Sequence, residues 1–352
     1  MKIKIAVLDK DLNYLNRFSI AFGTKYADKV EIHSFTDMDI ALSEIDSSKF
    51  DVLLASELFE IDADRVPSHC GLAYFTESSD IQSLRGKPAI GKFQKADLLY
   101  KQILGVYSDN AEGVSGIKLD GKQAALIVFA SPCGGVGTSS MAAACAVRYA
   151  EQGKRVLYIN MEDFGSADLY FDGEGQFDMS DIIFALKSKK ANIFAKLESC
   201  VKQSRENVYF YSSSQMALDM QELNSEETMR FFSELQNGGG YTHIIADMKF
   251  GLSRDMLERY RTAHAMVWVS DGSEAANKKI ERAYASLGIA EANSDAPLTK
   301  RLCLIYNKYS NKTSQSMGLD IREIGGSSRF DHASSAEVVS RLAKLDALDK
   351  IL

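Results

Sequence analysis

One stretch of sequence decides the fold of this chain: Ser131-Pro132-Cys133-Gly134-Gly135-Val136-Gly137-Thr138-Ser139-Ser140. It follows an apolar run at 124–130 and precedes an alanine-rich segment at 141–150. A strand, a glycine-rich loop and a helix in this order are the setting of a phosphate-binding loop. The glycines let backbone N–H groups turn inward, and the helix that follows adds the positive end of its dipole. We therefore predict a nucleotide-binding loop, with an ordinary strand–helix turn as the alternative.

The length and composition indicate a globular chain with two domains. A chain of 352 residues exceeds the size at which a single core usually stops growing, and 45% apolar with 25% charged residues is ordinary. The net charge of −7 argues against broad nucleic-acid binding. The five cysteines are scattered without a Cys-x-x-Cys pair, which fits reduced cytosolic thiols. No apolar run has the length of a signal peptide or a membrane span, so we expect a cytoplasmic protein.

The first hundred residues alternate between strand-like and helix-like segments. Such alternation predicts a doubly wound α/β domain with a parallel sheet. A polar stretch rich in Gly, Ser, Asp and Asn follows, and then the alternation restarts. We therefore predict a first domain at 1–107, a linker at 108–123 and a second α/β domain at 124–352. The strands expected in the first domain are at 4–8, 30–34, 52–55, 72–75 and 89–91, and the helices at 12–22, 38–45 and 95–104.

The pattern of 1–107 resembles a response-regulator receiver domain, which is flavodoxin-like. In that family the pocket residues stand at successive strand ends, and the residues in those places here are Asp9, Ser56, Thr76 and Lys92. Ser56 replaces the acceptor aspartate, and Lys10 replaces the second acid of the magnesium pair. A hydroxyl cannot form the acyl phosphate, and a lysine opposes a metal pocket that needs carboxylates. We expect a receiver-shaped domain that is not phosphorylated; a plain flavodoxin-like domain is the alternative.

The second half resembles the MinD/ParA ATPases, a P-loop family with a mostly parallel sheet. Residues 133–140 resemble the deviant Walker A loop of that family, and 154–162 resemble the strand that delivers its switch I acids. Residues 241–247 resemble the Walker B strand, and 302–308 the strand whose asparagine contacts adenine. The resemblance implies Mg²⁺ at Ser139 and Asp247. It implies ATP binding by Cys133, Gly134, Gly135, Val136, Gly137, Thr138, Ser139, Ser140, Glu162, Asp247, Asn307 and Lys308.

Several residues depart from this family. Cys133 replaces its signature lysine, Thr138 replaces the Walker lysine, and Asn160 and Glu162 stand where two aspartates are common. A hydrogen bond to a charged group contributes about 1.5–3 kcal/mol, so backbone N–H groups and Mg²⁺ suffice to bind ATP. Removing one preorganised donor costs about 10²–10³ in rate. We therefore expect at most a weak ATPase and assign no catalytic residue. Lys249 and Lys308 are the candidates to replace the missing charge.

A degenerate receiver fused to such a domain resembles the TadZ/CpaE branch, which helps to place Tad (Flp) pilus machinery at cell poles. The resemblance implies a cytoplasmic, polar, homodimeric ATP-binding scaffold that contacts pilus and secretion proteins. We expect no nucleic-acid partner and at most indirect or weak membrane contact, because the C-terminal helix expected at 335–352 mixes acidic and basic residues on its polar face. An active ParA/MinD-like positioning ATPase is the alternative, and a phosphorylation-controlled regulator is a third hypothesis.

Overall fold

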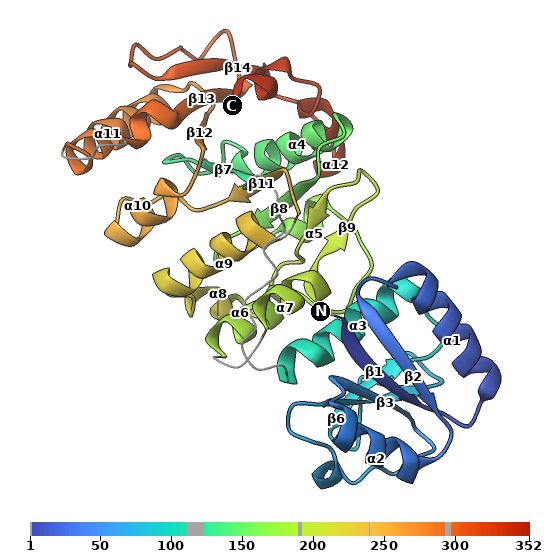
Figure 1. Ribbon diagram of the computed structural model, residues 1–352. Helices are drawn as coiled ribbons and strands as arrows, with labels where there is room; N and C mark the ends of the chain where they lie inside the picture. The colour runs from blue at the N-terminus through green and yellow to red at the C-terminus, as the bar shows by residue number, and fades with distance from the viewer. Residues whose placement is uncertain (1, 111–122, 189–191, 239, 293–296) are drawn as a thin grey trace. The chain divides into compact units, whose positions relative to one another are not determined.

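The computed structural model describes residues 2–110, 123–188, 192–238, 240–292 and 297–352. The chain divides into two compact units, both coloured by residue number in Figure 1. Unit 1 contains 1–117 together with 184–200, and unit 2 contains 118–183 and 201–352. Both units are α/β with mostly parallel sheets, which confirms the predicted fold class. Residues 111–122 of the expected linker lie outside the described residues, and the boundaries at 107 and 124 stay a prediction.

Unit 1 is built on a six-stranded sheet of order β2-β1-β3-β4-β6-β5. Its strands pair in parallel except for β5, which is an antiparallel edge. The elements of unit 1 are β1 (Ile3–Leu8), α1 (Leu12–Lys25), β2 (Val30–Phe35), α2 (Met38–Ser48), β3 (Val52–Ser56), the 3₁₀ turn η1 (Ala63–Arg65), β4 (Gly71–Thr76), β5 (Ser83–Leu84), β6 (Lys87–Gly91), α3 (Ala96–Asn110) and α7 (Ile193–Cys200).

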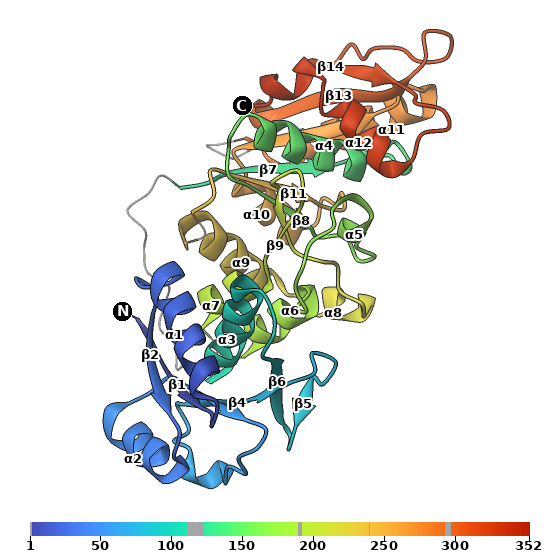
Figure 2. The same ribbon diagram turned by 90° about the vertical axis from the view of Figure 1, so that its right-hand side faces the viewer.

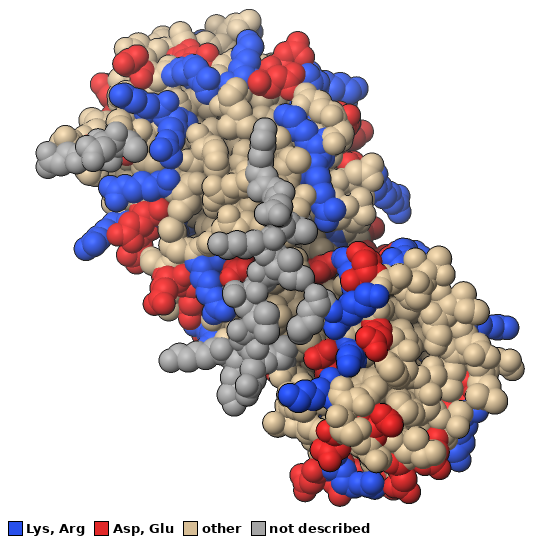
Figure 3. Space-filling view, viewed as in Figure 1, with Lys and Arg blue, Asp and Glu red and all other residues tan. Residues whose placement is uncertain are grey.

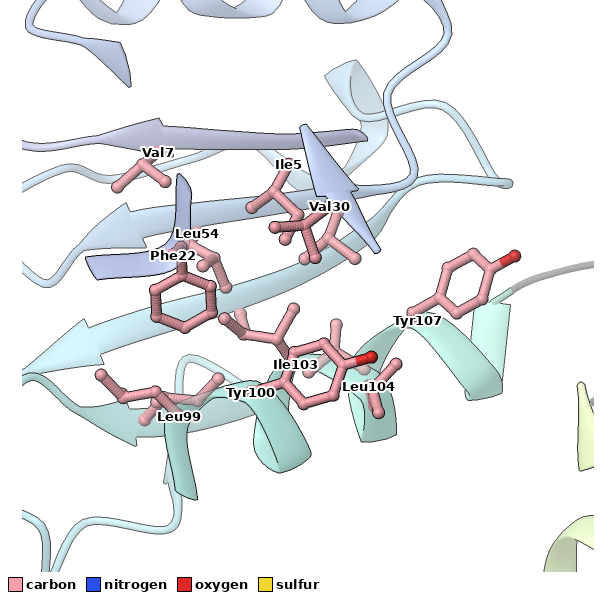
Figure 4. Packing of buried hydrophobic residues seen from close by; sticks show 14 of the residues in the cluster. Ile5, Val7, Phe22, Val30, Leu54, Leu99, Tyr100, Ile103, Leu104 and Tyr107 are labelled. Carbon is pink, nitrogen blue, oxygen red and sulfur yellow. The ribbon is translucent and has the colours of Figure 1, made fainter. Parts of the chain in front are cut away.

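The core of unit 1 forms because its central strands are apolar along their whole length. Every residue of β3 and β4 is buried, as expected of strands covered on both faces. Figure 4 shows one side of this core, where Ile5, Phe22 and Leu54 lie with Leu99 and Ile103 of α3. The carboxyl ends of the parallel strands therefore meet at one rigid edge, which carries the expected receiver pocket.

Helix α7 joins unit 1 although it lies between strands of unit 2 in the sequence. It packs along α3: the backbone N–H of Asn192, just before the helix, donates to Ser108 O, and Ala195 belongs to the apolar cluster of Figure 4. Lys196 is 3% exposed, and its Nζ lies 2.9 Å from Asp109 Oδ1. The chain thus covers the outer face of α3 with a segment drawn from its second half.

Unit 2 is built on an eight-stranded sheet of order β14-β13-β12-β7-β11-β8-β10-β9, in which only β9 runs antiparallel to its neighbour. Helix α4 follows β7 directly and packs against β8 and β11. The remaining elements are β7 (Ala125–Ala130), α4 (Thr138–Glu151), β8 (Val156–Asn160), α5 (Ala167–Tyr170), α6 (Met179–Lys187), β9 (Lys202–Gln203), β10 (Tyr209–Phe210), α8 (Ala217–Gln221), α9 (Ser225–Gly238), β11 (His243–Asp247), α10 (Arg254–Arg261), β12 (Ala265–Ser270), α11 (Glu274–Ala290), η2 (Leu298–Arg301), β13 (Leu302–Tyr309), β14 (Arg322–Ser328), α12 (Ser335–Leu342) and η3 (Asp346–Lys350).

The C-terminal region differs from the long helix expected at 335–352. Helix α12 ends at Leu342, and a separate 3₁₀ turn, η3, forms at Asp346–Lys350. Val339 and Leu342 are buried where α12 lies beside α4 (Figure 2), and Arg148 of α4 pairs with Asp349 at 2.5 Å. This region is therefore docked on unit 2.

The surface mixes charges of both signs. On the face shown in Figure 3, Lys and Arg side chains are interspersed with Asp and Glu rather than gathered into one basic patch. Within the described residues, no helix is long and apolar enough to cross a bilayer.

Candidate nucleotide-binding site

Three adjacent parallel strands bring the predicted site residues of unit 2 together. The phosphate loop follows β7, Asp247 ends β11, and Glu162 comes two residues after the end of β8. Asp247 lies opposite Phe129 on one neighbouring strand and Asn160 on the other. Ligands of parallel α/β sheets bind outside the carboxyl ends of the strands, and this is where the loop and both acids meet.

The loop depends on glycine at the N-cap of helix α4, the residue just before the helix. Gly135 and Gly137 have φ of 77° and 86°, in the left-handed region that favours glycine. Gly137 is the N-cap of α4, and no side chain caps this end. The first N–H groups of α4, from Thr138 and Ser139 onward, are therefore free of a side-chain cap and available to an anion.

Asp247 is fully buried below this loop. Its Oδ2 accepts hydrogen bonds from Asn160 Nδ2 at 3.0 Å and from the Tyr158 hydroxyl at 3.2 Å. Its Oδ1 is buried and makes no hydrogen bond among the described residues. Burial, and secondly the charge of Glu162, raises the pKa of Asp247 to about 7, although the Ser139 and Tyr158 hydroxyls act in the opposite direction. A buried carboxylate oxygen without a partner is the atom that a bound cation would satisfy.

Ser139 and Glu162 complete the group around Asp247. Ser139 Oγ donates to Glu162 Oε2 at 3.4 Å. No group of three or more His, Cys, Asp or Glu within the described part of the chain could hold a metal by itself. The donor set of one hydroxyl and carboxylates nevertheless fits Mg²⁺, which keeps several waters and takes further oxygens from a nucleotide. Ser139 and Asp247 would hold such an ion together with phosphate.

Tyr158 is a residue of the candidate site that the sequence analysis did not name. It is fully buried in β8, and its hydroxyl reaches the acid at the end of the neighbouring strand. The only signal in the sequence is period-two alternation, which places Tyr158 and Asn160 on the same face of β8. The alternation points to contacts with Asp247 only once β8 and β11 are known to be neighbouring strands.

Of the two lysines considered as replacements for the missing charge, only Lys308 contacts the loop. Lys308 Nζ donates to Gly135 O at 2.7 Å, and the neighbouring Asn307 Nδ2 donates to Val136 O at 2.8 Å. Lys249 instead pairs with Asp163, with Nζ at 2.7 Å from Oδ1. Lys308 is therefore the lysine that the fold brings to the phosphate loop.

The remaining loop residues have different surroundings. Cys133 is buried, and its Sγ lies 3.5 Å from Ala276 O of α11, which it can reach as a donor. Burial raises the pKa of the Cys133 thiol. Ser140 Oγ lies 3.4 Å from the Tyr170 hydroxyl, and Gly134 is exposed. Cys133 thus acts as a packing residue, turned away from the cradle.

The expected receiver pocket of unit 1 holds a buried ion pair. Lys92 Nζ lies 2.5 Å from Asp9 Oδ2, with the two side chains 9% and 2% exposed. Ser56 and Thr76 are fully buried, and Thr76 Oγ1 donates to Ser78 O. Lys10 lies over the Phe59 ring at 5.7 Å. The residues expected from the sequence do meet at one strand edge, but the lysine already neutralises the single buried acid.

Comparison with known proteins gives a family for unit 1 and a fold for unit 2. Residues 1–108 match the family described as TadZ-like, receiver domain. No protein of curated function matches the chain in sequence. A ParA family ATPase from Chlorobium tepidum has a similar structure, with a TM-score of 0.52 and 18% identity over 65% of this chain and 96% of that one.

Two further structures show lower similarity. A plasmid partition protein from Borrelia burgdorferi has a TM-score of 0.47 and 16% identity, over 63% of this chain and 97% of that one. The septum site-determining protein MinD from Pyrococcus horikoshii, solved with Mg-ADP, has a TM-score of 0.45 and 16% identity, over 65% and 98%. The first 108 residues therefore match a TadZ-like receiver domain, and the rest of the chain has the fold of a ParA family ATPase.

Proposed function

We propose that this protein is an ATP-binding localisation and assembly factor of the Tad (Flp) pilus machinery. It acts as a nucleotide-stabilised homodimer in the cytoplasm, at the cell pole, with little or no ATP hydrolysis. The observation that carries the proposal is the buried Oδ1 of Asp247, which has no partner among the described residues and lies at the strand end beside the glycine loop. The TadZ-like receiver domain supplies the link to the pilus machinery.

ATP binding is supported by main-chain groups and two oxygen ligands. The start of α4 offers N–H groups and a helix dipole to the phosphates, and Gly134 and Gly135 leave the approach unobstructed, with no heavy atom within 4 Å of a Cβ built on either. When bound, Mg²⁺ neutralises phosphate charge. Ser139 and Asp247 hold the ion, and Asp247 is kept in place by Tyr158 and Asn160.

Slow hydrolysis follows from what surrounds the phosphate site. Thr138 and Cys133 place no ammonium group where the family has lysines. Asn160 is neutral, and its amide nitrogen is engaged by Asp247. Glu162 is the remaining acid, and its Oε2 accepts a hydrogen bond from Ser139. Electrostatic stabilisation of the transition state is therefore weak, while ground-state binding through backbone groups persists.

An exposed apolar surface beside the site supports a homodimer. Phe164 is 79% exposed, and Leu169, Met216 and Leu218 are 57%, 58% and 64% exposed. Phe164 precedes α5 and Leu169 lies in it, while Met216 and Leu218 lie at the start of α8. The two segments are joined through Ser213, whose Oγ accepts a hydrogen bond from Ala167 N at 2.9 Å. Large apolar side chains exposed on two linked segments are typical of a protein-contact surface. A second copy of this chain is the proposed occupant, since Phe164 directly follows the Glu162 loop that bound ATP would order.

The test measures ATP binding with and without Mg²⁺ by calorimetry, using Ser139→Ala and the control Ser286→Ala, at an exposed serine of α11. We expect wild-type protein to bind Mg-ATP and to retain intact ATP in a mass spectrum. Ser139→Ala should weaken Mg-ATP binding about tenfold and leave metal-free ATP binding unchanged, because a single oxygen ligand is lost. Ser286→Ala should change neither. Absence of any wild-type association at millimolar ATP would refute the proposal.

The active positioning ATPase remains the second candidate. It is favoured by Glu162, a carboxylate within hydrogen-bonding reach of the Ser139 hydroxyl at the site. Turnover near ordinary enzyme rates, with ADP rather than ATP recovered from purified protein, would select this function. Abolition of that turnover in Glu162→Gln, with ATP binding retained, would assign the carboxylate its role.

A further inference from the structure

We propose that Asn307 and Lys308, which we call the loop clamp, set the shape of the phosphate loop and aim its N–H groups at the ligand. The two are positioning residues that act on the loop from the end of β13. This inference rests on the proposed nucleotide binding and deepens it, because it names the part of the nucleotide whose recognition depends on the clamp.

The clamp holds two consecutive peptide groups. Asn307 Nδ2 donates to Val136 O at 2.8 Å, and Lys308 Nζ donates to Gly135 O at 2.7 Å. Asn307 is 3% exposed, so its hydrogen bond to Val136 O is sheltered from water. A Cβ built on Gly137 would come within 2.4 Å of Asn307 Nδ2, which shows how closely the clamp is seated against the loop.

Because peptide groups are planar and trans, the two hydrogen bonds to the loop carbonyls also fix where the N–H groups of the same peptides point. In a trans peptide the C=O and the following N–H point in opposite directions. The carbonyl of Gly135 shares its peptide with the Val136 N–H, and the carbonyl of Val136 shares its peptide with the Gly137 N–H. With both carbonyls tied toward β13, both N–H groups face the opposite side. Neither N–H makes a hydrogen bond in the described part of the structure.

The backbone of Lys308 supports a role in positioning. Its φ is 60°, in the left-handed region that a non-glycine residue seldom adopts. Such a conformation costs free energy and is retained where surrounding contacts fix it, often at functional sites. Here it coincides with the charged hydrogen bond to Gly135 O. Thr138 and Cys133 offer no ammonium group to the phosphates. Lys308 instead acts on the loop backbone, through its hydrogen bond to Gly135 O.

The class of ligand follows from the backbone N–H groups that the clamp orients. Backbone N–H groups of a glycine loop bind the oxygens of a phosphate chain, whereas a nucleoside offers them nothing. Loss of the Lys308 contact should therefore weaken binding of nucleoside diphosphates and triphosphates and spare binding of adenosine. This selectivity separates the clamp from a residue that merely stabilises the fold, whose loss would affect all ligands alike.

The experiment compares Lys308→Met with the matched control Lys249→Met in the full chain, since Lys249 is exposed and pairs with Asp163 away from the loop carbonyls. Calorimetry with Mg²⁺ measures binding of adenosine, AMP, ADP and ATP. We expect Lys308→Met to weaken ADP and ATP about tenfold or more and adenosine less than twofold, because a charged hydrogen bond is removed. Lys249→Met should change none of these affinities. Equal losses for adenosine and ATP, or no loss for ATP, would overturn the clamp.

A second measurement tests the clamp without any ligand. Backbone order parameters of the 134–137 amides, measured by NMR relaxation, should fall in Lys308→Met and in Asn307→Ala, and stay unchanged in Lys249→Met, while the melting temperature stays within a few degrees. Unchanged order parameters in the loop would overturn the clamp even if wild-type protein bound no ATP. Failure of wild-type binding with a more mobile loop in Lys308→Met would instead refute the proposed function and leave the clamp standing.

Discussion

At the scale of single residues, the loop glycines differ in what they tolerate. Gly137 has φ of 86° and a Cβ there would meet Asn307 Nδ2 at 2.4 Å, whereas a Cβ on Gly134 meets nothing within 4 Å. We predict that Gly137→Ala lowers the free energy of unfolding by about 1–3 kcal/mol, because both strain and steric overlap are introduced. Gly134→Ala should change it by less than about 0.5 kcal/mol. Denaturant unfolding of the ligand-free protein measures both, and equal effects would contradict the loop geometry.

His243 gives unit 2 a dependence on pH. Burial lowers the pKa of His243 to about 4, and Lys154 and His264 act in the same direction. Because the unfolded side chain titrates near 6.5, the folded protein binds fewer protons between pH 6.5 and 4, and stability falls as pH falls through this window. We predict that His243→Gln reduces the loss of melting temperature between pH 7.5 and 4.5. His332→Gln, at an exposed position, serves as the control, and identical pH profiles for all three proteins would refute the prediction.

The sequence predicted the chemistry of a site residue where only its type and its place after a strand mattered. The absence of lysine at Thr138 and the hydroxyl at Ser56 are facts of sequence, and so is the glycine at 137. The direction of the Cys133 side chain was not readable, because it depends on the carbonyl that α11 presents at Ala276. Burial beside α11 makes Cys133 a packing residue.

At the scale of elements, α7 is the feature with the clearest consequence. Ala195 is 4% exposed and belongs to the apolar cluster of unit 1, whereas Phe184, in the same stretch of chain, is 72% exposed. We predict that Ala195→Glu speeds hydrogen exchange in α3, about 90 residues earlier in the sequence, because it buries an unpaired charge. Phe184→Glu should leave α3 protected. Mass-spectrometric exchange of peptides from 96–110 measures both, and an unchanged α3 in Ala195→Glu would show that α7 is dispensable to unit 1.

Strands and helices with strong local patterns were predicted well, and their ends less well. Strands β7 and β11 were expected, because a strand buried on both faces has a continuous apolar sequence, and both strands are buried in this way. The start of α9 is one such end: the reciprocal capping hydrogen bonds join Asn224 and Glu227, one residue before Ser225 and two residues after it. Strand β14 was not anticipated, because its sequence, Arg322–Ser328, is short of apolar residues and it forms at the edge beside β13.

At the scale of the whole molecule, the receiver-like pocket of unit 1 predicts that phosphotransfer fails. Lys92 neutralises Asp9 at 2.5 Å, and Ser56 is buried at the acceptor position. We predict no mass increase when the protein is incubated with acetyl phosphate and Mg²⁺, because no carboxylate is present to form the acyl phosphate. An active receiver domain treated in parallel is the positive control. A phosphorylated peptide from residues 1–110 would revive the phosphorylation-controlled regulator.

The sequence by itself determined the two α/β patterns, the glycine loop after a buried strand, and the chemical losses at Thr138, Cys133 and Ser56. These follow from local order along the chain: periodicity, glycine conformation and the identity of a side chain at a strand end. The tertiary structure alone decided that α7 packs on α3, that the Tyr158 hydroxyl donates to Asp247, and that Lys308 donates a hydrogen bond to the loop at Gly135 O. Each of these contacts joins segments far apart in sequence, and packing of the folded chain, rather than local propensity, selects them.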